Sequence, residues 1–259
     1  MAVFALRSAN EVVFGSGCRK QAGRLAAALG QRALLVTGRG AARRGLVDDF
    51  RGLLTGAGLQ VAVFDAVEPE PSLQTVEAGR EALRAHGADV VVAVGGGSAM
   101  DVGKAIGALA LHERGVEHYF AGGHEIAGAA MPVIALPTTS GTGAEVTPNS
   151  VLSDPGTLHK ASIRGLALMP RVAIVDPELT LGLPPQQTAF SGLDALVQAI
   201  ESYTSTGVNL VSDMYAEAAT LRLGRALRRA VATAATCPPA RTWRWGACWR
   251  GWPWPARGW

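Results

Sequence analysis

Cysteine is scarce in this sequence, and long apolar runs are missing. Cys18, Cys237 and Cys248 stand in no paired or metal-type spacing, which excludes a disulfide framework and a zinc ribbon. The longest apolar runs, residues 88–94 and 131–136, are far shorter than the roughly 20 residues of a membrane-spanning helix. The first residues also lack the basic, apolar and small-residue order of a secretory signal. We therefore expect no membrane partner and a cytoplasmic location.

The excess of positive charge is confined to the C-terminal end of the chain. A formal net charge of +3 would ordinarily favour a nucleic-acid partner. Beyond residue 231, however, there are four arginines and no acid, so residues 1–231 hold 20 basic and 21 acidic side chains. We therefore expect no nucleic-acid partner.

Tryptophan is absent from the first 242 residues, whereas six tryptophans fall within the last 17. Residues 232–259 are rich in Trp, Arg and Pro without helical or strand periodicity, so we expect an aberrant, disordered tail. One interpretation is a tail for membranes or single-stranded nucleic acid. A reading-frame change in a GC-rich gene explains the composition better, and the natural protein would then continue past residue 231.

Short β-type runs alternate with amphipathic helical stretches in the first two thirds of the chain, which predicts an α/β fold with a parallel sheet. From Pro185 onward the chain turns Ala- and Leu-rich, which predicts helices. The expected strands are residues 33–37, 61–64, 88–94, 133–136 and 172–175, and the expected helices are 45–58, 72–86 (capped by Ser72), 100–111, 187–203 and 210–231.

Two glycine- and hydroxyl-rich loops follow predicted strands. The first contains Gly95, Gly96, Gly97 and Ser98, and glycines with the free N–H groups of a helix start suit a pyrophosphate. A plain strand-to-helix turn explains this loop alone equally well. The second loop, residues 137–145, also sits at the carboxyl end of a strand, where open α/β sheets bind their ligands. Two such loops at one sheet edge favour a dinucleotide site.

Three polar residues are less informative by themselves. Asp194 and Gln198 are four positions apart, so they share a helix face and could point at one ion or substrate. Spacing alone favours a solvated polar stripe. Lys160 would either lie over the cleft formed by the two glycine- and hydroxyl-rich loops or be an ordinary surface charge.

In order and separation, the motifs over residues 4–231 resemble the iron-containing (group III) alcohol dehydrogenase family. They run from Val13-Phe14-Gly15, through the two loops with Asp101, Lys104 and Glu145, to Val175-Asp176-Pro177-Glu178-Leu179-Thr180 and Gly192-Leu193-Asp194-Ala195-Leu196. The resemblance implies a Rossmann-like nucleotide-binding α/β domain at 1–182. It also implies the start of an incomplete all-α metal domain at 183–231, ahead of the tail at 232–259.

The resemblance also implies a site and a reaction. The implied partner is a small-molecule alcohol or carbonyl substrate: NAD or NADP would accept a hydride from an alcohol whose oxygen is polarised by Fe²⁺ or Zn²⁺. Asp194 would be the catalytic metal ligand, with Gln198 at the next ligand position, and intact family members are expected to be homo-oligomers. The implied cofactor-binding residues are Gly95, Gly96, Gly97, Ser98, Asp101, Thr138, Thr139, Thr142, Lys160 and Leu179.

Three departures from the family pattern follow. Gln198 replaces the usual histidine ligand and is a poorer ligand for a borderline cation. The two further histidine ligands are absent, since the last histidine is His159. Gly38, beside Arg39, replaces the acid that usually holds the adenosine ribose, which weakens a preference for NAD and leaves room for a 2′-phosphate.

Three hypotheses remain. The first is a truncated or frame-shifted, impaired metal-dependent alcohol dehydrogenase. The second is a metal-independent relative, similar to maleylacetate reductase or hydroxyacid-oxoacid transhydrogenase. The third is a nucleotide-binding remnant without catalysis. Metal content separates the first two, and turnover separates both from the third.

Overall fold

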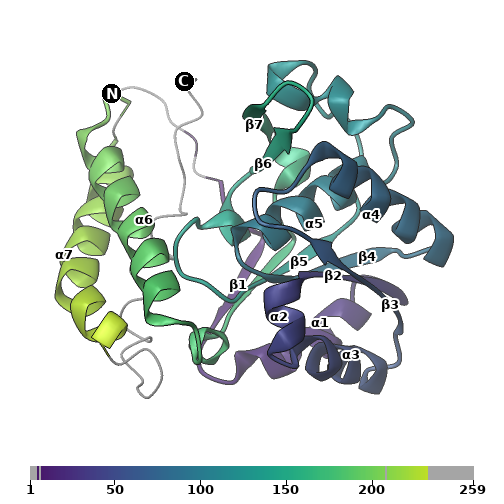
Figure 1. Ribbon diagram of the computed structural model, residues 1–259, viewed down its shortest axis with the longest axis horizontal. Coiled ribbons are helices and arrows are strands. Elements are labelled where there is room, and N and C mark those ends of the chain that lie inside the picture. Colours follow the sequence, from purple (N-terminus) through teal and green to yellow (C-terminus); the bar gives the residue numbers. More distant parts are fainter. Residues whose placement is uncertain (1–4, 6, 208, 233–259) are drawn as a thin grey trace.

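The computed structural model describes residue 5, residues 7–207 and residues 209–232 (Figure 1). The predicted disordered tail at 232–259 therefore lies outside the described residues, except for its first residue. Among the described helices, none combines the length and apolarity needed to cross a bilayer.

A six-stranded parallel sheet forms the centre of the molecule and confirms the predicted α/β class. Its spatial order is β1-β8-β5-β4-β2-β3. The five predicted strands are present, with ends that differ by at most three residues; the strand predicted at 172–175 has the same bounds in the structure. The bounds are β1 Glu11–Phe14, β2 Arg32–Gly38, β3 Gln60–Val67, β4 Val90–Gly95, β5 Val133–Pro137 and β8 Val172–Val175.

Helices cover both faces of this sheet (Figure 1). Successive strand residues point to opposite faces, so Leu34 of β2 packs under α4 and α5, whereas Leu35 packs with α1 and α3. This double burial explains why the central strands are continuous apolar runs. The helices are α1 Ala22–Ala27, α2 Arg39–Arg43, α3 Leu46–Gly56, α4 Leu73–His86 and α5 Gly97–Leu109.

Helix α4 begins and ends as its sequence predicts. The Ser72 side chain accepts a hydrogen bond from the Thr75 N–H, and Gly87 closes the helix in the left-handed conformation. The Glu68 carboxylate adds a further acceptor at the same end, for the Ser72 N–H and the Thr75 hydroxyl. The start of the helix is therefore fixed by side chains as well as by packing.

Several elements were not predicted from the sequence. Strand β1 is one, and an antiparallel hairpin of β6 Asn149–Asp154 and β7 His159–Arg164 is another. The hairpin strands mix polar and apolar residues and bury only a few side chains, so their composition carries a weak strand signal. Short 3₁₀ turns occupy Cys18–Gln21, Val116–His118, Phe120–Gly122, Ala144–Val146, Leu166–Leu168 and Pro177–Thr180.

Two long helices, α6 Pro185–Thr204 and α7 Leu210–Ala232, lie side by side next to the α/β part (Figure 1). Their seam is rich in alanine: Ala195 and Ala199 of α6 and Ala219 of α7 pack in one cluster with Leu223 of α7. Small side chains let the two backbones approach closely. The helical region predicted after residue 183 is thus present as one helical pair.

Candidate nucleotide-binding site

The first glycine loop joins the end of β4 to the start of α5. Gly95 has a φ of +156°, and a Cβ there would lie 2.6 Å from the Cβ of Ala99. A residue with a side chain would be strained here on both counts. Gly96 to Ser98 are partly exposed after a wholly buried strand, so the chain emerges from the core at this loop.

The start of α5 offers free backbone donors. The N-cap residue is Gly96, and no side chain caps this end of the 13-residue helix in the described structure. The first N–H groups of a helix lack partners within it and carry partial positive charge, which suits an anion. Gly103 lets α5 lie tightly on β4, because a Cβ there would be 2.6 Å from the Cβ of Ala93.

The second loop lies directly beside the first. Strands β4 and β5 are paired in parallel, with Gly95 opposite Pro137, and the Thr138 N–H donates to the Gly95 carbonyl at 2.7 Å. A Cβ at Gly96 would lie 3.5 Å from the Thr139 side chain. The two loops that the sequence placed at one sheet edge therefore form a single continuous surface.

One hydroxyl within this surface has no partner in the described structure. Ser140 is buried, and its Oγ makes no hydrogen bond there. A buried hydroxyl without a partner costs free energy, so a ligand or water that supplies one would be favoured. Ser140 lies in the second loop predicted from the sequence but was not among the predicted site residues; the available signal was its place between two threonines and a glycine.

The carboxylate of Asp101 binds protein groups on the hairpin side of α5. Its oxygens accept from Lys104 Nζ at 2.9 Å and from the Val151 N–H at 3.1 Å. Burial raises the pKa of Asp101, while the Lys104 charge opposes that rise. Lys104 in turn donates to the Asn149 carbonyl. These contacts fasten α5 to β6, and a direct contact of Asp101 with a cofactor stays a prediction.

Lys160 and Leu179 lie in different settings. Lys160 is on β7, and its exposed Nζ pairs with Glu70 Oε1 at 2.8 Å, which matches the alternative of a surface charge. Leu179 lies in the 3₁₀ turn after β8 and is buried in the same apolar cluster as Val94 and Leu136, the residues before the two loops. Of these two residues, only Leu179 thus packs beneath the loops.

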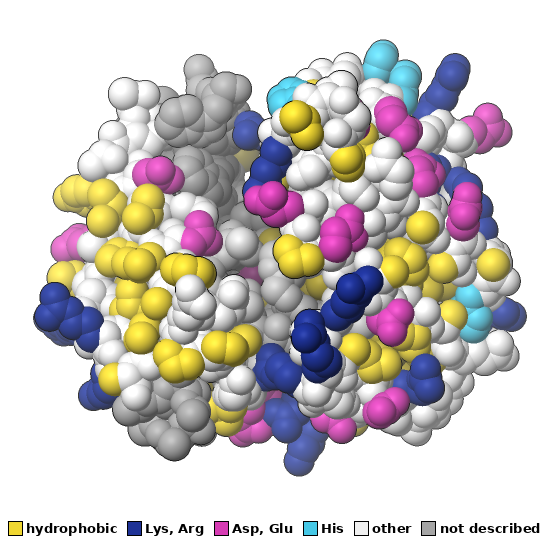
Figure 2. All heavy atoms as spheres, viewed as in Figure 1, with side chains coloured by type: hydrophobic (Ala, Val, Ile, Leu, Met, Phe, Trp, Pro, Cys, Tyr) yellow, Lys and Arg dark blue, Asp and Glu magenta, His cyan; other side chains and the backbone are white. Residues whose placement is uncertain are grey.

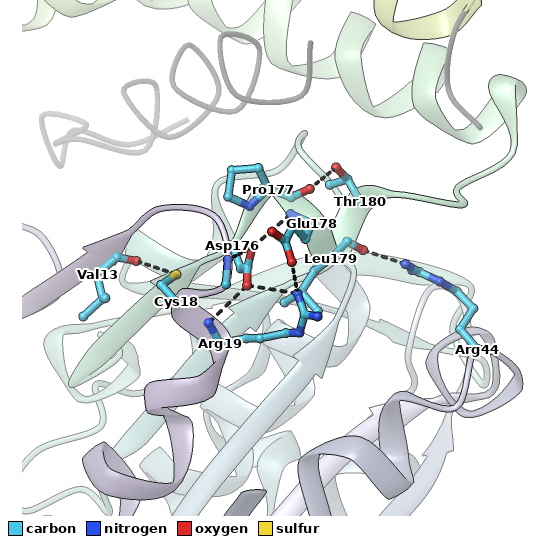
Figure 3. Close-up of polar contacts among 10 residues, drawn as sticks. Val13, Cys18, Arg19, Arg44, Asp176, Pro177, Glu178, Leu179 and Thr180 are labelled. Atoms are coloured by element: carbon cyan, nitrogen blue, oxygen red, sulfur yellow. Dashed lines mark hydrogen bonds and ion pairs between the residues drawn. The ribbon is translucent and has the colours of Figure 1, made fainter. Parts of the chain in front are cut away.

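Asp176, at the end of β8, organises the neighbouring chain segments (Figure 3). It is fully buried and accepts hydrogen bonds from the N–H groups of Gly17, Arg19 and Glu178, while the Arg19 guanidinium lies 3.3 Å away. Burial alone would lower the pKa of Arg19, but hydrogen bonding and charge from Glu178, with Asp176 adding to them, raise it. Asp176 was not predicted as a site residue; its signal was an acid directly after a buried strand.

Helix α6 places Asp194 against the second loop. A Cβ at Gly141 would lie 3.1 Å from Asp194 Oδ2 and 2.9 Å from the Ser191 carbonyl oxygen. Gln198 Nε2 donates to Asp194 Oδ1 at 2.5 Å, so the two residues predicted to share a helix face do so. The structure therefore brings a half-buried carboxylate next to the loops of the sheet edge.

The donors around Asp194 do not fit a metal ion. The Gln198 amide is a hydrogen-bond donor to the carboxylate, and the described part of the chain holds no group of three or more His, Cys, Asp or Glu residues arranged for a metal. Zinc sites in proteins use three or four such ligands. The pair Asp194 and Gln198 alone falls short of that number.

Comparison with known proteins identifies the family. The sequence profile described as "Iron-containing alcohol dehydrogenase" matches residues 9–177. The chain is 42% identical over 205 residues to 1,3-propanediol dehydrogenase of Klebsiella pneumoniae, covering 78% of this chain and 53% of that protein. It is 39% identical over 221 residues to choline dehydrogenase of Bacillus subtilis, covering 84% and 55%. The chain thus spans about half the length of these curated relatives.

Solved structures agree with this assignment. Sulfoacetaldehyde reductase from Bifidobacterium kashiwanohense, in complex with NAD⁺, superimposes with a TM-score of 0.91 at 34% identity, covering 97% of this chain and 66% of that one. A 1,3-propanediol oxidoreductase gives a TM-score of 0.91 at 36% identity, with 96% and 65% covered. The chain belongs to the iron-containing alcohol dehydrogenase family, which confirms the predicted family and its Rossmann-like fold.

Proposed function

We propose that this chain binds NAD or NADP and serves hydride transfer between a small alcohol and its carbonyl compound. One observation carries the proposal: two glycine- and hydroxyl-rich loops adjoin at the carboxyl ends of β4 and β5, with Asp194 of α6 against the second loop. Membership of the family and a relative in complex with NAD⁺ support the same chemistry. A cytoplasmic location and homo-oligomerisation remain expectations.

The residues present fit a dinucleotide. Gly97 lies so close to Thr142 that a side chain at position 97 would fill the cradle between the loops. Backbone N–H groups of Gly96, Gly97 and Ser98 would hold the pyrophosphate at the start of α5. Thr138, Thr139 and Thr142 would contact the nucleotide from the second loop. Asp101, Lys160 and Leu179 would complete the set of cofactor-binding residues. When bound, the oxidised nucleotide supplies the hydride acceptor for the alcohol.

The chain's own residues define where the alcohol would lie. The Asp194 carboxylate lies against the second loop at Gly141, so it is placed to orient a hydroxyl next to the nucleotide or to accept its proton. The Gln198 amide fixes the Asp194 carboxylate by donating to it. The resemblance implies Fe²⁺ or Zn²⁺ bound by Asp194 and Gln198, but this donor set does not fit such an ion, and we derive no step through one.

A second candidate function is a metal-independent relative. The hydrogen bond between Gln198 and Asp194 favours it, because that bond satisfies a carboxylate oxygen that a metal would otherwise take.

The division into a nucleotide domain at 1–182 and a helical domain from 183 is likewise proposed.

Nucleotide binding and turnover test the proposed function. We expect NADH or NADPH to bind the full chain with a quenched or shifted nicotinamide fluorescence. Gly97→Val should abolish this binding, whereas Gly52→Ala, where a Cβ meets no atom within 4 Å, should leave it intact. Alcohol-dependent reduction of NAD⁺ or NADP⁺ then tests catalysis. Absence of binding of either nucleotide would contradict the proposal, and binding without turnover would reduce it to nucleotide binding.

A further inference from the structure

Helix α6 has one long side that no described element covers. Its buried residues Ala195 and Ala199 pack with α7, while Ser191 and Asp194 meet the second loop at Gly141. Among the described elements, α7 is the one that packs extensively against α6. The side of α6 that points away from Ala195 and Ala199 is therefore left in solvent.

Large apolar side chains occupy that side. Phe190, Leu193, Val197 and Ile200, here called the α6 stripe, are 58%, 50%, 50% and 45% exposed. Their spacing alternates between three and four residues, which places them in one line along the helix. This is the pattern of a seam that packs against another helix. Figure 2 shows hydrophobic side chains spread over the helical pair, as viewed in Figure 1.

The α6 stripe is large for a surface that stays in water. Half of a side chain of this size is on the order of 100 Å², and Tyr203, 56% exposed, adds a further one near the end of the same helix. Monomeric proteins rarely expose apolar patches beyond a few hundred Å². Two such surfaces buried against each other amount to roughly 1,000 Å², which is the lower limit of a stable protein interface.

The charges of α6 suit a second copy of the same helix. Between Pro185 and Thr204 there is no Lys or Arg, and the acids are Asp194 and Glu201. Asp194 is turned to the second loop and accepts a hydrogen bond from Gln198. Glu201, which is exposed, is therefore the charge left beside the α6 stripe.

Antiparallel packing of two such helices places Glu201 favourably. The start of α6 has no side-chain cap and no acid in its first turn. In the antiparallel arrangement Phe190 lies opposite Ile200 of the second copy and Leu193 lies opposite Val197. Glu201 then comes next to the uncapped helix start of the other copy, where free N–H groups and the helix dipole stabilise a carboxylate. Parallel packing would instead bring both Glu201 side chains to the same end.

We infer that two copies of this chain associate in solution through their α6 stripes, packed antiparallel about a two-fold axis. A two-fold axis makes the interface self-complementary, since the same patch is used on both copies and each contact occurs twice. The inference goes beyond the proposed function, because no contact with a nucleotide enters it. Either can therefore fail without the other.

Sedimentation of the full chain at several concentrations tests the dimer. We expect an average mass that rises with concentration from one chain to two. The variant Leu193→Glu/Val197→Glu should raise the dimer dissociation constant about a hundredfold or more, because carboxylates of both copies would meet in an apolar seam. The control Leu111→Glu changes a 62% exposed leucine outside the helical pair and should leave that constant within about twofold. Thermal unfolding confirms that each variant is folded.

Disulfide cross-linking tests the antiparallel arrangement. In a chain with Cys237→Ser and Cys248→Ser, the variant Phe190→Cys is mixed with the variant Ile200→Cys and oxidised by glutathione disulfide. The mixture should form the mixed disulfide several-fold faster than either variant forms a disulfide with itself. Faster cross-linking of each variant with itself would overturn the inferred arrangement.

Tryptophan fluorescence distinguishes a competing occupant of the α6 stripe. All six tryptophans lie within residues 243–259, so intrinsic emission reports on that segment alone. A chain that is monomeric at every concentration would overturn the inference. A shift of its emission to longer wavelength in Leu193→Glu/Val197→Glu would then assign the stripe to the chain's own C-terminal segment. A dimer of unchanged affinity in that variant would also overturn the inference, since another surface would then hold the copies together.

Discussion

A methyl group at Gly97 would lie 2.8 Å from Cγ2 and 3.0 Å from Oγ1 of Thr142. These two residues belong to different loops, 45 positions apart in the sequence, and they meet where β4 and β5 end. Gly97 is the first residue of α5, and its φ is not positive, so its backbone conformation does not require glycine. The need for glycine at position 97 therefore comes from the second loop. The two loops therefore depend on each other for their spacing.

This dependence predicts a non-additive pair of substitutions. Gly97→Ala should lower the free energy of unfolding by about 1–3 kcal/mol, the usual cost of overpacking. Thr142→Ala removes both close atoms and leaves a Cβ at 3.3 Å, so Gly97→Ala should cost clearly less in that background. Urea unfolding of the four proteins measures the coupling. The matched control, Gly52→Ala in α3, meets no atom within 4 Å and should stabilise the chain by up to about 1 kcal/mol. Additive costs at positions 97 and 142 would show that the loops do not touch.

Asp176→Asn should be among the most destabilising single changes. The buried carboxylate accepts from three backbone N–H groups and faces the Arg19 guanidinium, so an amide would direct N–H donors at other donors. Breaking a buried charged pair typically costs about 3–5 kcal/mol. Glu178→Gln, at a 40% exposed side chain of the same cluster, should cost less than about 1 kcal/mol. Chemical denaturation compares the free energies of unfolding of the two variants. An equally small loss in both would show that Asp176 does not have this structural role.

The sequence predicts those helices and strands whose stabilising contacts are made by residues close together in the chain. The strand at 88–94 and the helix at 72–86 follow from an apolar run and from a capping serine, and both are present. The hairpin of β6 and β7 was missed because its strands are mostly half-exposed and polar, and pairing partners decide such strands.

The candidate site shows the same division. The glycines at positions 95–97 indicate the first loop by composition alone. The Asp176 cluster depends on Arg19, 157 positions away, and no periodicity in the sequence predicts it. The ion pair of Lys160 with Glu70 likewise joins segments 90 positions apart. Contacts of this kind follow from the topology of the sheet and not from any local pattern.

Glu68 should make the stability of the start of α4 depend on pH. Burial would raise the pKa of Glu68, but hydrogen bonds from Ser72 and Thr75 outweigh it, and the folded pKa is lowered. A lowered folded pKa contributes stability above the unfolded value of about 4.3, and this stability is lost as pH falls through the folded pKa. Glu68→Gln should therefore lower unfolding free energy by about 1 kcal/mol near pH 7, the usual worth of a helix cap.

That difference between Glu68→Gln and the unchanged chain should shrink as the pH falls from about 4.3 through the lowered folded pKa of Glu68, below which both side chains are neutral. This stability difference is measured from the urea midpoints of both proteins, from pH 7 down to the lowest pH at which they are folded. Glu81→Gln removes the same charge from an exposed position of α4 and should show no such dependence. A gap for Glu68→Gln that widens in acid would contradict the lowered pKa.

Metal removal should leave nucleotide affinity unchanged. The loops that would hold the nucleotide use backbone N–H groups and hydroxyls, and Asp194 is engaged by the Gln198 amide. We therefore expect the dissociation constant of NADPH or NADH to be the same before and after dialysis against EDTA. Elemental analysis of the purified chain should find well below one Fe or Zn per chain, because the described residues offer no group of three ligands.

Gln198→His sharpens this test, because it places an imidazole four residues after Asp194 in place of an amide that donates to the carboxylate. Histidine and carboxylate are ordinary ligands of Zn²⁺ and Co²⁺. The variant should bind Co²⁺ measurably in an absorption titration, whereas the unchanged chain and Gln198→Ala should not, and Asp194→Asn should abolish the gain. One tightly held Fe or Zn in the unchanged chain, lost in Asp194→Asn together with nucleotide binding, would instead establish a metal-dependent site completed by residues outside the described part of the chain.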